Sequence, residues 1–344
     1  WSSKHFQSLF INPDSVKKVN THCDAKRTLY RDNFSELQQI WKQESDQINH
    51  TFDTIVTTNK LYTNYHYPTL TSSGEVIAYK EGLAQEGALV ILHPTGDEII
   101  TRTGTMYDYK FAYNDATLVW SEYKSHTRWT HGGKMVLASY DMRHKKYRRY
   151  PTQENRYAPF AVGSNWGFVE VDKEDNASLV IVDNTFEKEI FRVKGTGDEL
   201  FVHPSYDGQN NIITIVVSSK GKQIEAIDIH TGKRTPLTAF TPYEIDNPIV
   251  VNNQIIYRGA FDANNSLYRQ TTPQQFGHNA LTSKFGLRYP IASPDKDSIL
   301  FSFYTSDGYK PGKIAFSKLD NKPIENKTFW IADSMTRQEN WQFE

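Results

Sequence analysis

A unit of about 45 residues recurs six times along this chain of 344 residues, and no other feature limits the possible folds as strongly. In five units a proline stands ahead of an apolar stretch, and successive units start about 42 to 48 residues apart. These prolines are Pro68, Pro159, Pro204, Pro248 and Pro290; the second unit lacks the proline, and Phe111 marks the equivalent place. We expect the five prolines at equivalent places near the start of the first strand of each unit.

Each unit continues with further apolar stretches that are separated by turns. Residues 88–92 and 98–101 show this in the first unit, and residues 228–233 form the clear hairpin turn Asp-Ile-His-Thr-Gly-Lys. Four short strands at this period are typical of a β-propeller blade. The sequence therefore predicts an all-β fold, a six-bladed β-propeller of four-stranded antiparallel blades over residues 58–333. A short helical segment over residues 1–57 precedes it, and a tail over residues 334–344 follows it.

Composition narrows the classes of function. Lys and Arg number 39 against 40 for Asp and Glu, so the chain lacks the strong positive field that binds nucleic acid or an acidic membrane surface. Cys23 is the single cysteine, which excludes an intramolecular disulfide and a cysteine-rich metal site. No apolar run is long enough to cross a bilayer. We therefore predict no nucleic-acid partner and no membrane span.

Motifs of catalysis are missing from the sequence. The zinc-peptidase run His-Glu-x-x-His, the hydrolase elbow Gly-x-Ser-x-Gly, a phosphate-binding loop and paired Cys-x-x-Cys do not occur. These motifs place a nucleophile, a base or metal ligands at the spacing that their chemistry requires. The prediction is therefore a protein that is not an enzyme, with no cofactor and no bound metal.

The stretches that enter the first strand of each unit carry the candidate binding residues, because in a propeller they converge on one mouth of the central channel. Mixed aromatic, cationic and anionic groups at such a mouth suit the capture of a peptide or a polar small molecule. The alternative is that these polar groups only solvate a water-filled channel. The candidate residues are Tyr65, His66, Asp108, Arg156, Tyr157, His203, Asp246 and Arg288.

A second candidate is the long connection in the second unit, over residues 123–133. Its side chains His126, Arg128, Trp129 and His131 are predicted to contact a partner. Metal binding by the two histidines is one alternative, and a surface loop with incidental histidines is the other.

The stretch 289–303 contains Tyr-Pro, then Ser-Pro-Asp, then Ile-Leu-Phe-Ser-Phe, and it resembles the blade signature of TolB-like (WD-repeat-like) six-bladed propellers of bacteria. Leu237-Thr238, which closes the fourth unit, is similar to that signature as well. The resemblance implies a periplasmic or extracellular protein. The leading hypothesis for the function is a non-enzymatic scaffold that engages a protein, peptide or glycan at the channel mouth.

The N-terminal segment has a helical pattern. Asn33 with Glu36 has the spacing of a capping box, and an apolar stripe expected to pack on the propeller follows. The stripe consists of Phe34, Leu37, Ile40 and Trp41. This stretch resembles the connector between a gluzincin-like peptidase domain and a TolB-like propeller. The resemblance implies an alternative function, an accessory region of a larger peptidase whose catalytic domain lies outside this chain.

A third hypothesis is a propeller enzyme of the lactonase or phytase kind with a divalent metal in the channel. Such a metal site needs several oxygen or nitrogen ligands from different blades. Asp108, Asp246 and His203 are the only obvious candidates, and this hypothesis ranks last.

Overall fold

The computed structural model describes residues 35–37, 39–40, 42–43, 47, 50–55, 59, 61–83, 85–129, 132–261, 264–270 and 276–324. The chain forms two compact units, residues 1–49 with 305–307 and residues 50–304 with 308–344. In the described part of the first unit, residues 35–37, 39–40 and 42–43 are helical. Leu37 and Ile40 are 39% and 48% exposed, so they lack the burial that we expected. Phe34 and Trp41 lie outside the described residues.

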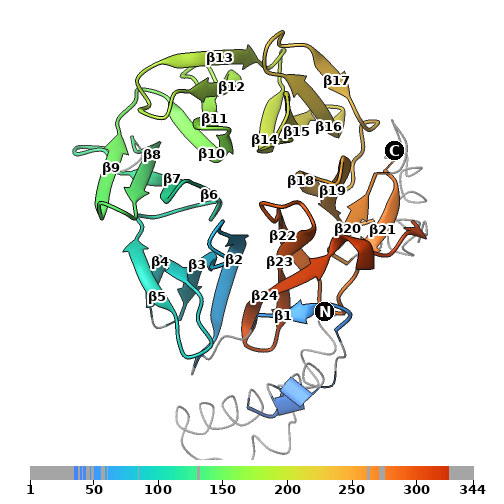
Figure 1. The fold of residues 1–344 in the computed structure, drawn as a ribbon. Helices are drawn as coiled ribbons and strands as arrows, with labels where there is room; N and C mark the ends of the chain where they lie inside the picture. Colours follow the sequence, from blue (N-terminus) through green and yellow to red (C-terminus); the bar gives the residue numbers. More distant parts are fainter. Residues whose placement is uncertain are drawn as a thin grey trace, which may run out of the picture. The chain divides into compact units, whose positions relative to one another are not determined.

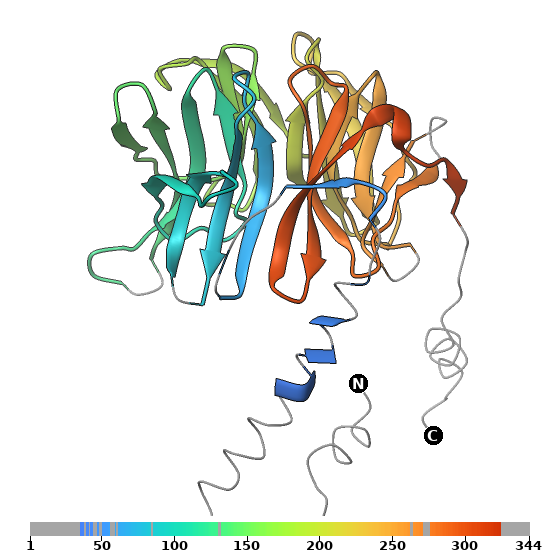
Figure 2. The same cartoon turned by 60° about the horizontal axis from the view of Figure 1, so that its bottom comes forward.

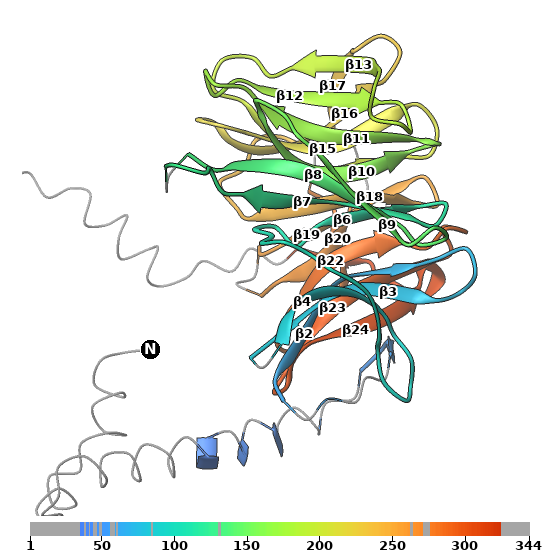
Figure 3. The ribbon, with the colours of Figure 1, turned by 90° about the vertical axis from the view of Figure 1, so that its left-hand side faces the viewer.

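The second unit is a ring of six antiparallel sheets, which confirms the predicted six-bladed β-propeller (Figure 1). The first sheet contains β2 (Thr63–Leu70), β3 (Val76–Gly82), β4 (Gln85–Ile91) and β5 (Glu98–Arg102). The second contains β6 (Phe111–Asn114), β7 (Thr117–Lys124), β8 (Lys134–Asp141) and β9 (Lys146–Tyr150). The third contains β10 (Asn155–Val162), β11 (Asn165–Val171), β12 (Ala177–Val182) and β13 (Glu189–Lys194). Figure 3 shows these three sheets from the side, one above the other.

The remaining three sheets complete the ring. The fourth contains β14 (Leu200–Tyr206), β15 (Asn211–Ser218), β16 (Gly221–Asp228) and β17 (Arg234–Pro236). The fifth contains β18 (Ile245–Val251), β19 (Gln254–Gly259), β20 (Ser266–Arg269), β21 (His278–Leu281) and the added strand β25 (Lys322–Pro323). The sixth contains β22 (Leu287–Ala292), β23 (Ser298–Thr305), β24 (Gly308–Ala315) and β1 (Asp53–Thr54), and a 3-10 turn, Phe316–Lys318, follows β24.

Strand β1 comes from the N-terminal side of the repeats and closes the sixth sheet. Asp53 pairs with Lys313 of β24, and Thr54 pairs with Gly312. Figures 1 and 2 show β1 against β24, and β24 beside β2 of the first sheet. The predicted boundary after residue 57 therefore falls too late, because a two-residue strand has no periodicity that a sequence pattern reveals.

Hydrophobic clusters fill the spaces between neighbouring sheets. One joins Trp120 and Leu118 of the second sheet to Ile77 and Leu89 of the first, and another joins the third sheet to the fourth. Because the inner strands are covered on both faces, they read as continuous apolar runs; in β12 (Ala177–Val182) all residues are buried. Sheet-to-sheet packing of this kind fixes the channel that the innermost strands surround.

All five prolines lie at equivalent places, in the interior of the innermost strands rather than near their starts. Each falls where the pairing register with the next strand shifts, which marks a β-bulge. The residue before each proline has a positive φ, as does Tyr109 in the second sheet. Lys110, and not Phe111, is therefore the structural counterpart of the prolines in the second sheet.

Candidate functional site

Six residues at equivalent places, one in each sheet or directly before it, have the left-handed backbone conformation. They have φ between 45° and 56°, and none of them is glycine. Non-glycine residues in this conformation are uncommon and cluster at functional sites. The six residues are Tyr67, Tyr109, Ala158, His203, Asn247 and Tyr289.

Two side chains of this region reach across the channel. The Tyr67 hydroxyl donates to Asn247 Oδ1 at 3.0 Å, which links the first sheet to the fifth. Lys110 Nζ donates to the carbonyl oxygen of Pro204 at 2.6 Å, which links the second sheet to the fourth. Tyr67 is fully buried, and Lys110 is 7% exposed. We call these two bonds and the four residues that form them the septum.

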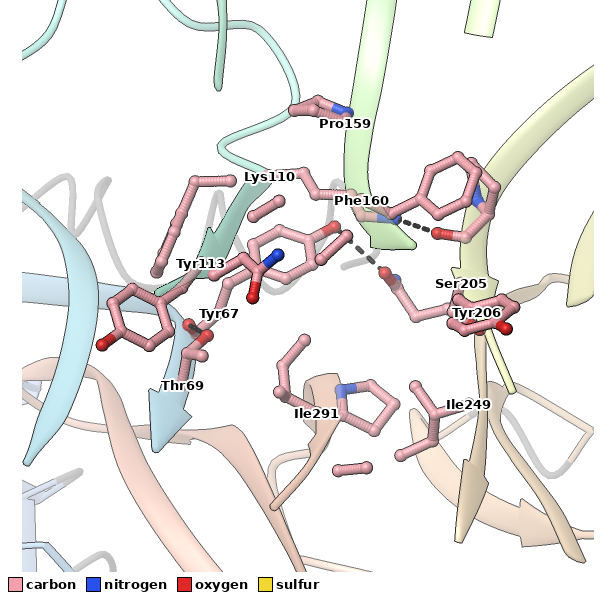
Figure 4. A pocket seen from close by; sticks show the side chains of 18 of the residues that line it. Tyr67, Thr69, Lys110, Tyr113, Pro159, Phe160, Ser205, Tyr206, Ile249 and Ile291 are labelled. Atoms are coloured by element: carbon pink, nitrogen blue, oxygen red, sulfur yellow. Dashed lines mark hydrogen bonds between the residues drawn. The ribbon is translucent and has the colours of Figure 1, made fainter. Parts of the chain in front are cut away.

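Two cavities share the septum residues Tyr67 and Asn247 in their walls. One lies at the starts of the innermost strands, has a volume of about 480 Å³, and is called the charged cavity here. The other lies at their ends, has a volume of about 410 Å³, and is called the apolar cavity. Figure 4 shows the apolar cavity with Phe160, Ile249 and Ile291 in its wall.

The walls of the charged cavity come from four of the six sheets, from the stretches before β6 and β18, and from the connection between β19 and β20. They contain three carboxylates, two arginines, a histidine and four tyrosines. The residues are Tyr67, Tyr107, Asp108, Tyr109, His203, Glu244, Asp246, Asn247, Arg258, Asn265, Arg288 and Tyr289. Four of them were candidates from the sequence, namely Asp108, His203, Asp246 and Arg288.

Arg258 is bonded to two carboxylates and an amide of this wall, those of Asp246, Glu244 and Asn265. Its Nε donates to Asp246 Oδ1 at 2.6 Å, and its Nη2 forms a second ion pair with the same carboxylate. Nη2 also lies 3.3 Å from Glu244 Oε1. Burial alone would raise the pKa of Asp246, but the hydrogen bonds and charge of Arg258 hold that pKa below its usual value. Asp246 is therefore ionised, and four hydrogen bonds engage Arg258 with Asp246, Glu244 and Asn265.

Arg288 differs from Arg258 in this respect. Within the described part of the chain no carboxylate forms an ion pair with it, and its buried Nε has no hydrogen-bond partner. Its guanidinium carbon lies 5.5 Å from the ring centre of Tyr309. An aromatic face stabilises a cation without neutralising it. Arg288 is thus a positioned cation in the cavity wall without a carboxylate partner among the described residues.

The remaining titratable groups of the wall are affected mainly by burial. Burial lowers the pKa of His203 to about 4, so its imidazole is neutral at pH 7, and its Nδ1 has no partner among the described residues. Burial raises the pKa of Asp108, which the charge of Lys110 opposes. Neutral His203 therefore adds no positive charge, and the cations of this wall are its two arginines.

Lys110 of the septum has an unusual proton affinity. Burial lowers its pKa to about 8, although Asp108 acts in the opposite direction. Between about pH 8 and 10 an unfolded lysine still holds the proton that folded Lys110 has lost. The unfolded state then binds more protons, so the free energy of unfolding rises with pH in this window.

We therefore expect Lys110→Met to remove a pH-dependent part of the stability. The difference in unfolding free energy between wild type and this variant should grow in favour of the wild type from about pH 7 to about pH 9.5. Urea unfolding at several pH values measures this difference. A difference that stays constant over the window would show that Lys110 keeps the proton affinity of an exposed lysine.

Four predicted mouth residues do not line the charged cavity, although the ring of His66 stacks on that of Tyr109 in its wall at 4.5 Å. Tyr65 is fully buried and donates to Asp97 at 2.5 Å. Arg156 forms an ion pair with Glu170 at 2.9 Å and lies over the ring of Phe168. His66 is buried beside Glu81 at 3.0 Å, and Tyr157 packs in the cluster between the third and fourth sheets.

The pleat of the innermost strand explains the places of Tyr65 and Arg156, which stand one residue before the positions equivalent to Asp246 and Arg288. His66 and Tyr157 occupy those equivalent positions themselves. Side chains of a strand alternate between its two faces, and the bulge residue interrupts the alternation. Neither effect is visible in the spacing of the repeats. Among the wall residues, sequence reasoning did not find Tyr67, Asn247, Arg258 and Glu244. Arg258 in β19 stands opposite Asp246 in the sheet register, a pairing that the predicted strands could have indicated.

The loop of the second sheet is held by its own histidine. His126 Nδ1 accepts the backbone N–H groups of Arg128 and Trp129 at 3.1 and 3.2 Å, so this nitrogen is engaged. Arg128 is exposed, and Trp129 is 68% exposed. His131 lies outside the described residues. Contact of this loop with a partner remains a prediction.

Residues 35–324, excluding the gaps given above, contain no group of three or more His, Cys, Asp or Glu side chains that could hold a metal ion. In the same residues no helix has both the length and the apolar character needed to cross a membrane.

No family model matches the chain, and no curated protein is similar in sequence. Solved structures share its fold. A protein of unknown function from Dyadobacter fermentans has a TM-score of 0.51 and 11% identity, over 77% of this chain and 97% of that one. TolB from Acinetobacter baumannii has a TM-score of 0.44 and 11% identity, over 86% of this chain and 70% of that one.

A propeller-containing prolyl endopeptidase has a TM-score of 0.48 and 8% identity, over 89% of this chain. The chain spans 55% of the length of that endopeptidase. At such identities the similarity shows the fold alone. The structure thus confirms a six-bladed β-propeller, and the function depends on the residues of the site.

Proposed function

We propose that this propeller is a non-enzymatic binding protein that holds a carboxylate-bearing ligand in the charged cavity, with Arg288 as its anchor. The observation that supports this most strongly is that Arg288, in the wall of a cavity of about 480 Å³, has no carboxylate partner among the described residues. Cavities that bind small ligands have volumes of about 300 to 1,000 Å³. An arginine offers a planar pair of donors that matches the two oxygens of a carboxylate.

The charges of the wall support an anionic group at this place. Arg258 engages both Asp246 and Glu244, and Asp108 is influenced by Lys110. Arg288 is the cation that remains without a carboxylate partner in the described wall. A ligand carboxylate would complete the pairing.

Aromatic side chains around Arg288 favour a ligand with apolar parts. Tyr109 and Tyr289 line the cavity, and Tyr309 lies under the guanidinium. Aromatic rings combine a large contact area with little conformational entropy to lose on binding. The ligand is therefore a peptide, a protein segment or an acidic glycan rather than a bare inorganic anion.

The resemblance to TolB-like propellers supports a periplasmic or extracellular location for this binding. The other function considered, an accessory region of a larger peptidase, stays a prediction. Both functions leave the propeller itself without a catalytic group.

Replacing Arg288 with Ala tests the proposal directly. We expect a loss of about 10- to 100-fold in affinity for carboxylate-bearing ligands, because hydrogen bonds to charged groups contribute about 1.5–3 kcal/mol. The measurement is binding to an array of short peptides and acidic oligosaccharides, each with a neutral counterpart in which the carboxylate is an amide. Ligands found on the array are then titrated by calorimetry.

Arg156→Ala serves as the matched control, because Arg156 is bound to Glu170 and lies outside the cavity wall. Its affinity for the ligand should equal that of the wild type. Equal affinity of the Arg288 variant and the wild type would contradict the proposal. Turnover of a ligand by the purified chain would contradict the non-enzymatic part of it.

A further inference from the structure

We infer that the charged cavity receives the C-terminal end of a polypeptide, whose terminal carboxylate meets Arg288 and whose apolar side chains lie on the surrounding face. This inference rests on the proposed function, and it adds the class of ligand and the way in which the ligand enters. Two observations support the inference, a cavity that is closed at its base and the distribution of exposed apolar side chains.

The septum closes the base of the charged cavity. Tyr67 crosses from the first sheet to Asn247 of the fifth, and its ring centre lies 4.3 Å from that of Tyr289 of the sixth sheet. Lys110 crosses from the second sheet to Pro204 of the fourth. These side chains therefore tie together five of the six sheets at one level. An extended chain that enters from the charged side cannot continue through the propeller, so it must end there or turn back.

One face of the propeller carries the exposed apolar side chains. We call the face at the starts of the innermost strands the entry face. The antiparallel order of each sheet places two kinds of connection there, those before the innermost strand and those between the second and third strands. Leu61, Leu83, Tyr107, Trp129, Leu200 and Tyr243 all lie in such connections or at the first residue of an innermost strand. Their exposed fractions range from 43% to 86%.

The opposite face is different. Its connections are tight polar turns, such as those at Asp115 and Lys145, which have positive φ. The other large exposed apolar residues of the described propeller, Ile99, Tyr147 and Ile190, belong to the outermost strands β5, β9 and β13. In the described residues the exposed apolar groups of the connections thus lie on the face of the charged cavity and not on the face of the apolar one. Such a gathering around a polar pocket marks a site of interaction.

The nature of these side chains favours a polypeptide over a glycan. Sugars stack on aromatic rings, but they have no apolar group that matches an isolated leucine. Three of the six side chains are leucines, Leu61, Leu83 and Leu200. Tyr107 belongs to both the cavity wall and the exposed set, so the exposed set reaches the cavity at this residue. A polypeptide end supplies the required combination, a carboxylate at the tip and apolar side chains behind it.

Three pools of fluorescein-labelled peptides test this inference by fluorescence anisotropy. Each peptide has a Gly-Ser spacer next to the dye, followed by five positions of mixed Leu, Ile, Val, Phe and Trp. The first pool ends in a free carboxylate, and the second ends in an amide. The third also ends in an amide and carries one Asp in its third position. We expect the first pool to bind wild type at least about 10-fold more tightly than the other two, since it alone has a terminal charge.

Two variants of the full chain accompany these pools. Arg288→Ala should reduce binding of the first pool about 10- to 100-fold. Replacement of both Tyr107 and Trp129 by Ser should weaken the same pool several-fold, since exposed aromatic side chains dominate many interfaces. Ile190→Ser, on the outer strand β13, is the control and should leave the affinity unchanged. Circular dichroism checks that each variant is folded.

The outcomes separate the inference from the proposed function. Equal binding of the first and third pools, both dependent on Arg288, would leave the proposed function standing and overturn the end-on entry. Binding of acidic oligosaccharides that depends on Arg288, with no binding of any peptide pool, would also leave the proposed function standing and overturn the entry of a polypeptide end. Binding of the first pool that is unaffected by Arg288→Ala would overturn both.

Discussion

Replacing Phe52 with Ala should lower the free energy of unfolding by about 3–5 kcal/mol, the usual effect of removing a buried phenylalanine. Phe52 is 8% exposed, and its ring lies 4.9 Å from that of Phe301 and 5.0 Å from that of Phe303. It directly precedes β1, whose pairing with β24 completes the sixth sheet. The substitution therefore weakens the place where the ring of sheets closes. Urea denaturation followed by circular dichroism measures the effect.

Asp53→Ala is the matched control. Asp53 is the next residue and is exposed, and the backbone pairing of β1 does not depend on its side chain. The control should change the free energy of unfolding by less than about 0.5 kcal/mol, as is usual for surface sites. A small effect of Phe52→Ala would show that β1 does not contribute to the stability of the sixth sheet.

The second large effect concerns Arg258. Arg258→Met should destabilise the propeller by about 3–5 kcal/mol, because it leaves the buried carboxylate of Asp246 without its partner. Asp246 and Arg258 are 9% and 7% exposed. The double variant Arg258→Met with Asp246→Leu should recover most of this loss, since an apolar pair of similar volume often replaces a buried ion pair without cost. A double variant as unstable as the single one would show that packing, and not the unpaired charge, causes the loss.

The ion pair of Asp246 and Arg258 also predicts how the free energy of unfolding depends on pH. In the wild type the folded state holds the pKa of Asp246 below its usual value, so its contribution is present above about pH 4 and is lost as pH falls through the folded pKa. Without Arg258, burial raises the pKa of Asp246 instead. Protonation of Asp246 at low pH then removes the unpaired buried charge of the variant. The gap between wild type and Arg258→Met should therefore be largest near pH 7 and shrink toward about pH 4. A constant gap would contradict this origin of the loss.

The repeat predicted the architecture because each blade uses the same local signals. Pro68, Pro159, Pro204, Pro248 and Pro290 stand in the same structural place, and their spacing alone gave the number of blades. In the second sheet the predicted equivalent of the proline is one residue too late, because Lys110 and not Phe111 occupies that place. The error has a physical reason. The shared element is the left-handed residue of the bulge, and a side chain type does not reveal its φ.

Strands β1 and β25 could not be predicted from the sequence for another reason. Each has two residues, and each pairs with a strand that is remote or belongs to another part of the repeat order. Short edge strands form because an unpaired edge offers free backbone groups, and nearly any residue can occupy them. Their place depends on the completed ring.

Sequence reasoning found part of the candidate site. The topology of a propeller correctly placed Asp108, His203, Asp246 and Arg288 around one cavity. It could not tell that Arg156, offered as the equal of Arg288, is held by Glu170 fourteen residues away. The septum could not be predicted from the sequence either, because Tyr67 and Asn247 are 180 residues apart in the chain. Contacts across a closed ring carry no local pattern.

A crystal structure of the chain with a peptide that ends in a free carboxylate tests the central claim most directly. The account predicts density in the charged cavity, with the carboxylate oxygens within hydrogen-bond distance of the Arg288 guanidinium and the chain leading out across the entry face. Density in the apolar cavity or along the outer strands, with only water beside Arg288, would contradict it.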